Sequence, residues 1–201
     1  FDGIILWRDF NYGPTAKPGD YRARLTVGAE SQEVSFKILQ DPRSNASGAD
    51  LQAQFNFVIE SRDLLTRAHQ EIRSIRKLRE QTSAVKNRIE SKGGNEDLVS
   101  AIEELNGKLD EIEQALYQTK SESEQDPLNF PIRLNNKLSD LMKTTSVGDA
   151  APTAQAIQVK EEVSAAIVAE LDALETIWRE DVPAINRRFE AAEISVIETE
   201  R

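Results

Sequence analysis

Residues 96–120 read EDLVSAIEELNGKLDEIEQALYQTK, and the fold class follows from this stretch. Its aliphatic side chains are spaced alternately by four and three positions. They are Leu98, Ile102, Leu105, Leu109, Ile112 and Leu116. This heptad spacing predicts an amphipathic helix that packs along a partner helix in a coiled-coil-like seam. Gly107 falls outside the seam, where it lowers helix propensity but removes no packing contact.

The stretch before it, residues 49–92, predicts the partner helix. Apolar positions recur there at nearly the same period, at Leu51, Phe55, Val58, Leu65, Ile72, Ile75, Thr82 and Ile89. One helix over these residues is about 60 Å long, because each residue adds ~1.5 Å. Gly93 and Gly94 end it, and Asn95 is expected to cap the next helix. We therefore expect an antiparallel pair of helices.

Two further helices are predicted after the polar loop at residues 121–126. The third begins near Pro131 and carries Leu134, Leu138, Leu141 and Met142. The fourth follows Pro152 and carries Ile157, Val163, Ile167, Leu171, Leu174 and Trp178. Pro183 is expected to kink or end it. The predicted fold class is mainly α: a long antiparallel four-helix bundle over residues 49–192, with a tail at 193–201.

The first forty residues have a different period. Large apolar and polar side chains alternate in residues 21–27, YRARLTV, and again at Val34, Phe36 and Ile38. Two such runs around a short loop with Gly28 predict a β-hairpin. An isolated hairpin is marginally stable in water, so we expect this one to belong to a larger sheet or to pack on the helices. Residues 1–40 are thus a hairpin segment, and 41–48 a linker.

Charge separates the predicted helices. Residues 62–92 are basic, with nine Lys or Arg and four Asp or Glu. Residues 95–125 are acidic, with two Lys or Arg and nine Asp or Glu, and so are residues 150–201, with five Lys or Arg and eleven Asp or Glu. A basic helix between two acidic ones favours an antiparallel arrangement with charge pairs across the grooves. The net charge of -10 disfavours binding to nucleic acid or to anionic lipid. No apolar run approaches the ~20 residues that span a bilayer, so membrane insertion is not expected.

Catalytic motifs are missing. The one histidine, His69, has Thr66 three residues before it, so the Glu-x-x-His pair of di-metal bundles is absent. There is no Gly-x-Ser-x-Gly elbow, no phosphate-binding glycine loop and no cysteine. Adjacent carboxylates such as Glu103 and Glu104 are expected on a solvated helix face. We therefore predict no catalytic residue, no cofactor and no metal site.

One segment stands out from this pattern. Residues 126–138, DPLNFPIRLNNKL, contain both apolar and amide side chains and are longer than a simple loop needs to be. Their candidate residues are Asn129, Arg133, Asn135 and Asn136. One interpretation is a buried turn whose asparagines satisfy backbone groups. The other is a binding role for Asn135 and Asn136.

Several stretches together resemble a known family. They are PGDYxxRLTV at 18–27, DPR at 41–43, ADLxAQF at 49–55, ALYQ at 115–118, LNFPIRLNNKL at 128–138 and PTAQ at 152–155. They resemble the C-terminal region of bacterial proteins known as glycosyl hydrolases with BNR repeats, which are related to sortilin-type β-propellers. The resemblance extends from about Trp7 to Asn186. In that family a propeller comes first, an immunoglobulin-like sandwich follows, and a helical region ends the chain.

The resemblance implies a function. The hairpin would be the end of the immunoglobulin-like domain, and the chain a non-catalytic structural or interaction module of an exported, periplasmic or extracellular protein. Its partners would be the upstream propeller and sandwich, and another envelope protein. Because the sequence starts at Phe1, we expect it to be cut from a longer chain. The alternative is an accessory part of a carbohydrate-active hydrolase, which requires a pocket lined by aromatic and carboxylate side chains.

Overall fold

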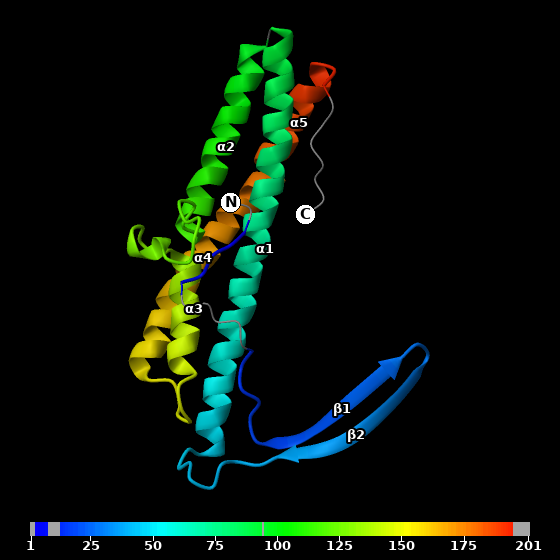
Figure 1. Ribbon diagram of the computed structural model, residues 1–201. Coiled ribbons are helices and arrows are strands. Elements are labelled where there is room, and N and C mark those ends of the chain that lie inside the picture. The colour runs from blue at the N-terminus through cyan, green and yellow to red at the C-terminus, as the bar shows by residue number, and fades with distance from the viewer. Residues whose placement is uncertain (1–2, 8–12, 94, 195–201) are drawn as a thin grey trace.

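The computed structural model describes residues 3–93, apart from 8–12, and residues 95–194 (Figure 1). The elements are β1 (Gly19–Val27), β2 (Glu30–Ile38), α1 (Gly48–Lys92), α2 (Glu96–Leu116), the 3-10 helix η1 (Asp126–Leu128), α3 (Leu134–Thr145), α4 (Ala154–Thr176), the π-helix η2 (Ile177–Asp181) and α5 (Val182–Ala191). The protein is mainly helical with one antiparallel hairpin, as the sequence predicts.

Helix α1 begins at a sharply defined point. The Ser47 hydroxyl accepts a hydrogen bond from the Asp50 N–H at 3.2 Å, and the Asp50 carboxylate accepts one from the Ser47 N–H at 2.9 Å. This capping box satisfies two backbone donors that a helix start leaves without partners. At the other end Gly93 adopts a φ of 67° and stops the helix. Asn95 starts α2 in the left-handed conformation, but its side chain makes no capping hydrogen bond, contrary to expectation.

The helices form three layers. The 45 residues of α1 extend about 68 Å, whereas α2 and α3 reach only about 32 and 18 Å at ~1.5 Å per residue. Helix α2 packs on the C-terminal half of α1, and α3 packs on its N-terminal half (Figure 1). The rod of α4, η2 and α5 crosses both. A bundle of four helices side by side is thus not confirmed, because α2 and α3 share one layer.

The seam between α1 and α2 is the one that the sequence predicts. Expected residues on both sides of it are buried: Leu98, Leu105, Leu109 and Ile112 on α2, and Ile72, Ile75, Thr82 and Ile89 on α1. Near the start of α1 the predicted stripe is less accurate, since Phe55 is partly exposed and Phe57 is buried in its place. An ideal helix drifts by about 20° per heptad, which accounts for a change of face over so long an element.

Charge pairs join α1 to α2 in antiparallel order. Arg76 pairs with Glu113, Arg79 with both Glu113 and Asp110, and Lys86 with Glu103. Here the basic helix meets an acidic one, as expected from the sequence.

Between α1 and α4 the polarity is reversed, because Lys160 on α4 pairs with Glu60 on α1. The charge pattern therefore describes the α1–α2 contact and not the α1–α4 contact.

The helix boundaries differ from expectation in the second half of the chain. Helix α2 ends at Leu116 rather than near Lys120, and α3 starts at Leu134 rather than near Pro131. Pro183 neither ends nor interrupts the last rod, because the π-helix η2 lies just before it. The wider π turn removes the clash between a proline ring and the carbonyl four residues earlier, so the helix continues into α5.

The hairpin projects away from the helices (Figure 1). Its strands pair from Gly19 opposite Ile38 to Val27 opposite Glu30. Gly28, with a φ of 60°, occupies the first of two turn residues, as two-residue hairpin turns favour. Residues 3–7, by contrast, lie against the helices and not beside the strands. The predicted origin of the hairpin in an immunoglobulin-like sandwich is not confirmed.

The α1–α2 seam gives a test of stability. The Leu105 side chain is only 4% exposed. Replacing it by Ala leaves a cavity, so we expect the free energy of unfolding to fall by about 2–5 kcal/mol. Urea denaturation followed by circular dichroism measures it. The control is Gly107→Ala, two residues on, where an added Cβ meets no atom within 4 Å and helix propensity gains ~1 kcal/mol. Equal midpoints for Leu105→Ala and the parent would contradict the seam.

Candidate functional site

A buried ion cluster lies at mid-length of α1, beside the end of α2. The Glu113 side chain is only 2% exposed. Its two oxygens accept hydrogen bonds from Arg76 Nε at 2.7 Å and from Arg79 Nη2 at 2.6 Å. A buried carboxylate without partners would be very costly, and the two guanidinium groups pair with this one and fix its position. Both arginines come from α1, one helical turn apart, which is why they reach the same carboxylate.

Arg76 extends this cluster toward the surface. Its guanidinium lies 5.3 Å from the centre of the Tyr117 ring, a cation–π distance. Tyr117 directly follows the last residue of α2, and its side chain is almost fully buried. The Tyr117 hydroxyl and the Arg76 guanidinium therefore occupy fixed positions where α2 ends and α3 begins.

Two asparagines at the start of α3 face the same junction. Asn135 Oδ1 accepts a hydrogen bond from the Asn136 N–H at 2.8 Å, so Asn135 Nδ2 points to His69 Nε2 at 3.2 Å. His69 thus accepts through Nε2 and is neutral. Burial, with a smaller contribution from the charge of Arg73, lowers the pKa of His69 to about 4. Asn136 Nδ2 donates to the Asp140 carboxylate at 3.1 Å.

The N-terminal segment crosses this junction. We call residues 3–7 the strap; it lies across the helices at mid-height in Figure 1. Arg76 donates to the Gly3 carbonyl at 3.0 Å, and the Ile5 N–H donates to the Tyr117 hydroxyl at 3.2 Å. The Trp7 N–H donates to Asn136 Oδ1 at 2.6 Å, and Asn136 Nδ2 lies 3.5 Å from the Trp7 carbonyl oxygen.

We call Arg76, Tyr117 and Asn136 the clamp. Its three side chains come from α1, the end of α2 and α3, and all three bind the backbone of the strap. The side chains of Ile4 and Leu6 pack against the helical core. The clamp therefore joins all three helices to one N-terminal segment that is 73 to 129 residues away in sequence.

The residues expected from the sequence divide into two pairs. Asn135 and Asn136 are buried, and Asn136 belongs to the clamp. Asn129 and Arg133 are exposed and contribute nothing to it. Arg76, Glu113 and Tyr117 were not expected, since their spacing is that of ordinary helix surface. The apolar run at residues 4–7 was the available signal for a buried N-terminal segment.

The apolar face of the hairpin is a second candidate. The pairing puts Tyr21, Ala23, Leu25 and Val27 of β1 on one face with Glu30, Gln32, Val34 and Phe36 of β2. Leu25, Val27 and Val34 are 68, 71 and 62% exposed. On the other face Arg22 and Arg24 each form an ion pair with Glu33. One face thus carries exposed apolar side chains, with Gln32 and Glu30 opposite Leu25 and Val27, while the opposite face is polar.

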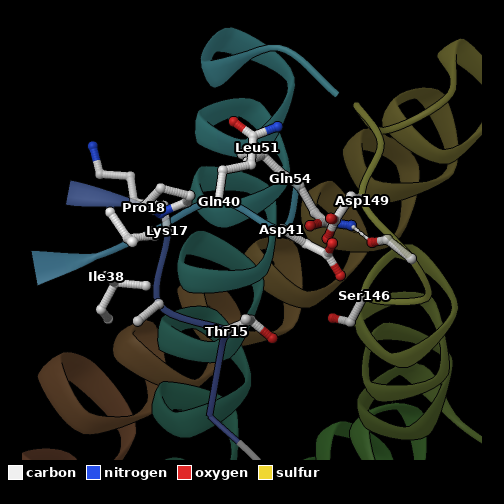
Figure 2. Close-up of a pocket in the computed structure, with 13 residues that line it drawn as sticks. Thr15, Lys17, Pro18, Ile38, Gln40, Asp41, Leu51, Gln54, Ser146 and Asp149 are labelled. Carbon is white, nitrogen blue, oxygen red and sulfur yellow. Dashed lines mark hydrogen bonds between the residues drawn. The ribbon is translucent and has the colours of Figure 1, made fainter. Parts of the chain in front are cut away.

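A cavity of about 310 Å³ lies between the root of the hairpin, the start of α1 and the loop after α3 (Figure 2). Asp41, Asp149 and Ser146 lie on one side of it, and Pro18 and Ile38 on the other. Its lining residues include two carboxylates but no aromatic ring.

Asp41 is not a proton donor at neutral pH. Hydrogen bonds from the Arg43 side chain and backbone hold the pKa of its carboxyl below the usual range. The cavity therefore has no aromatic side chain in its lining, and Asp41 does not serve as the protonated acid of a sugar-cleaving site.

Other chemical sites are not seen in the described part of the chain. No group of three or more His, Cys, Asp or Glu residues there could hold a metal ion. No described helix is long and apolar enough to cross a bilayer. Comparisons with protein-family models, with curated proteins and with solved structures found no match to this chain.

His69 gives a pH-dependent prediction. Its pKa is about 4 in the folded chain and ~6.5 when unfolded, so the unfolded state binds the proton more tightly below neutral pH. The stability that the neutral ring provides is fully present above pH 6.5 and is lost as the pH falls to 4. Between pH 6.5 and pH 4 we expect the free energy of unfolding to fall by up to about 3 kcal/mol less in His69→Gln than in the parent, because glutamine does not titrate.

Urea denaturation at pH 7, 5.5 and 4.5 measures this difference. Because other carboxylates also titrate there, only the gap between the two pH profiles reports on His69. Parallel profiles would contradict the assigned neutral state.

Proposed function

We propose that this chain is a non-catalytic interaction module whose hairpin completes the β-sheet of a neighbouring domain. The observation that carries the proposal is the alternation on the hairpin. Its apolar side chains lie on one face and are exposed, and two pairs across the strands, Tyr21 with Phe36 and Ala23 with Val34, join the two strands on that face. A two-stranded sheet with an uncovered apolar face is marginally stable, so it needs a second sheet to pack against.

The resemblance noted in the sequence suggests what that neighbour is. In this proposal the neighbour is an immunoglobulin-like sandwich that precedes the chain in an exported bacterial β-propeller protein. The helical part then acts as an antiparallel bundle that braces the upstream domains or presents a surface to another envelope protein. Two features support this role. Helix α1 is stiff and long, and the hairpin leaves the helices at one end (Figure 1).

Hydrogen exchange of the hairpin amides tests the proposal. It requires a longer polypeptide in which a β-rich domain precedes this chain. We expect amides of β1 and β2 to exchange at least about tenfold more slowly in that polypeptide than in the chain alone, because the partner sheet suppresses opening. Equal rates in both, or the absence of any such polypeptide, would refute the proposal.

A substitution on the apolar face sharpens this test. Val34→Ser should change the stability of the chain alone by at most about 0.5 kcal/mol, because the side chain is exposed there. In the longer polypeptide the same change should cost about 1–3 kcal/mol, because the side chain is then buried. Arg24→Ser on the opposite face is the matched control and should change neither protein by more than about 0.5 kcal/mol.

A catalytic role is tested separately. We expect no turnover of chromogenic glycosides by the pure chain, because Asp41 is held ionised by Arg43 and no aromatic side chain lines the cavity. A spectrophotometric assay measures the released phenol. Turnover that disappears in Asp41→Asn or Asp149→Asn would contradict the non-catalytic assignment and favour an accessory role in a hydrolase.

A further inference from the structure

The strap is bound as a peptide ligand is bound. Its hydrogen bonds run from side chains of the helices to backbone atoms of the strap, at Gly3, Ile5 and Trp7. The two residues between them, Ile4 and Leu6, pack against the core. Alternate residues of an extended chain face opposite sides, so backbone recognition and side-chain burial alternate along it. This is the pattern by which grooves recognise extended peptides.

The clamp is held in place without the strap. Arg76 is fixed by its hydrogen bond to Glu113, and the Tyr117 ring packs beneath the Arg76 guanidinium. Asn136 donates to Asp140, and its own backbone N–H is held by Asn135. Each group that meets the strap is therefore oriented by the helices themselves. A site organised in advance loses little conformational freedom when its ligand enters.

We propose that the clamp is a binding site for an extended peptide with aliphatic side chains at two alternating positions, and that residues 3–7 are its intramolecular ligand. The backbone contacts accept any sequence with free N–H and C=O groups, and the positions of Ile4 and Leu6 set the preference for branched aliphatic side chains. A second peptide of this class gains access by competing with the strap, whose tether raises its effective concentration. This inference does not depend on the function proposed for the hairpin.

Amide exchange in the unsubstituted chain gives the first test. The Ile5 and Trp7 amides donate to the clamp, whereas the Leu6 amide makes no hydrogen bond to a described residue. We expect the first two to exchange at least about tenfold more slowly than the Leu6 amide, after correction for intrinsic rates. Equal rates for all three would refute the docked strap.

Binding of a probe gives the second test. The probe is a fluorescent, end-capped peptide with the sequence of residues 3–7. Leu6→Asp in the full chain places a charge against the core and releases the strap, so this variant should bind the probe at least about tenfold more tightly than the parent. Circular dichroism verifies its fold, and Ile4→Ser is the milder alternative if Leu6→Asp does not fold.

Variants of the clamp and of the probe then identify the site. In the Leu6→Asp chain, adding Tyr117→Phe and Asn136→Leu should weaken probe binding at least about tenfold, because both hydrogen bonds to the backbone are lost. Adding Asn129→Ala, on the exposed loop, should not change it. A probe N-methylated at the position of Trp7 should bind far less well than one N-methylated at the position of Leu6. No probe binding to a folded variant, or equal binding by both methylated probes, would overturn the proposal.

Discussion

The apolar stripe of α1 runs for about 57 Å from Leu51 to Ile89 at ~1.5 Å per residue, and no other uninterrupted α-helix of the described chain can cover it. The chain covers it with two shorter helices end to end. Together α2 and α3 extend about 50 Å, and the end of α2 meets α3 in a junction on α1. Arg76 and Arg79 reach this junction through Glu113 and Tyr117 near the end of α2. The clamp is built where these two helices meet.

Helix ends explain why the junction is polar. The last carbonyls of α2 and the first N–H groups of α3 have no partner within their own helices. A purely apolar junction would leave them unsatisfied, and Asn135 serves one of them by accepting from the Asn136 N–H. Glu113 adds a buried charge to the junction, which lowers stability unless it is fully paired. Two arginines from consecutive turns of α1 supply that pairing. The registry of α2 on α1 is therefore fixed by Glu113 as well as by the apolar seam.

The sequence predicts the local features well. The spacing of apolar residues determines the α1–α2 seam and the hairpin register. Leu105, Thr82 and Val34 lie where this spacing places them. The sequence does not show that α2 and α3 lie end to end in one layer. The lengths of the helices can be read from the sequence, but their positions along α1 cannot. Pro183 correctly indicated a break in regular α-helix, because α4 ends at Thr176, but not the form of that break. A proline signals the loss of a hydrogen bond but not the π turn that accommodates it.

The candidate site shows where sequence reasoning stops. Asn135 and Asn136 attracted attention because amides are unusual in such an apolar segment. Their partners, however, lie 66 and 129 residues away, and nothing in the spacing of α1 separates Arg76 from its solvated neighbours. Long-range polar contacts leave no periodic trace, so the pairing of Asn136 with Trp7 needed the structure. The apolar run at residues 4–7 indicated burial but not a binding partner.

The covalent chain links the strap to the hairpin. Trp7 is held by α3 at the level of His69, and Lys17 at the hairpin root hydrogen-bonds to Gln52 near the start of α1. These levels on α1 are about 26 Å apart at ~1.5 Å per residue. The ten residue steps from Trp7 to Lys17 reach at most about 33–36 Å. The hairpin root can therefore move only about 10 Å farther along the helix axis before the strap is pulled.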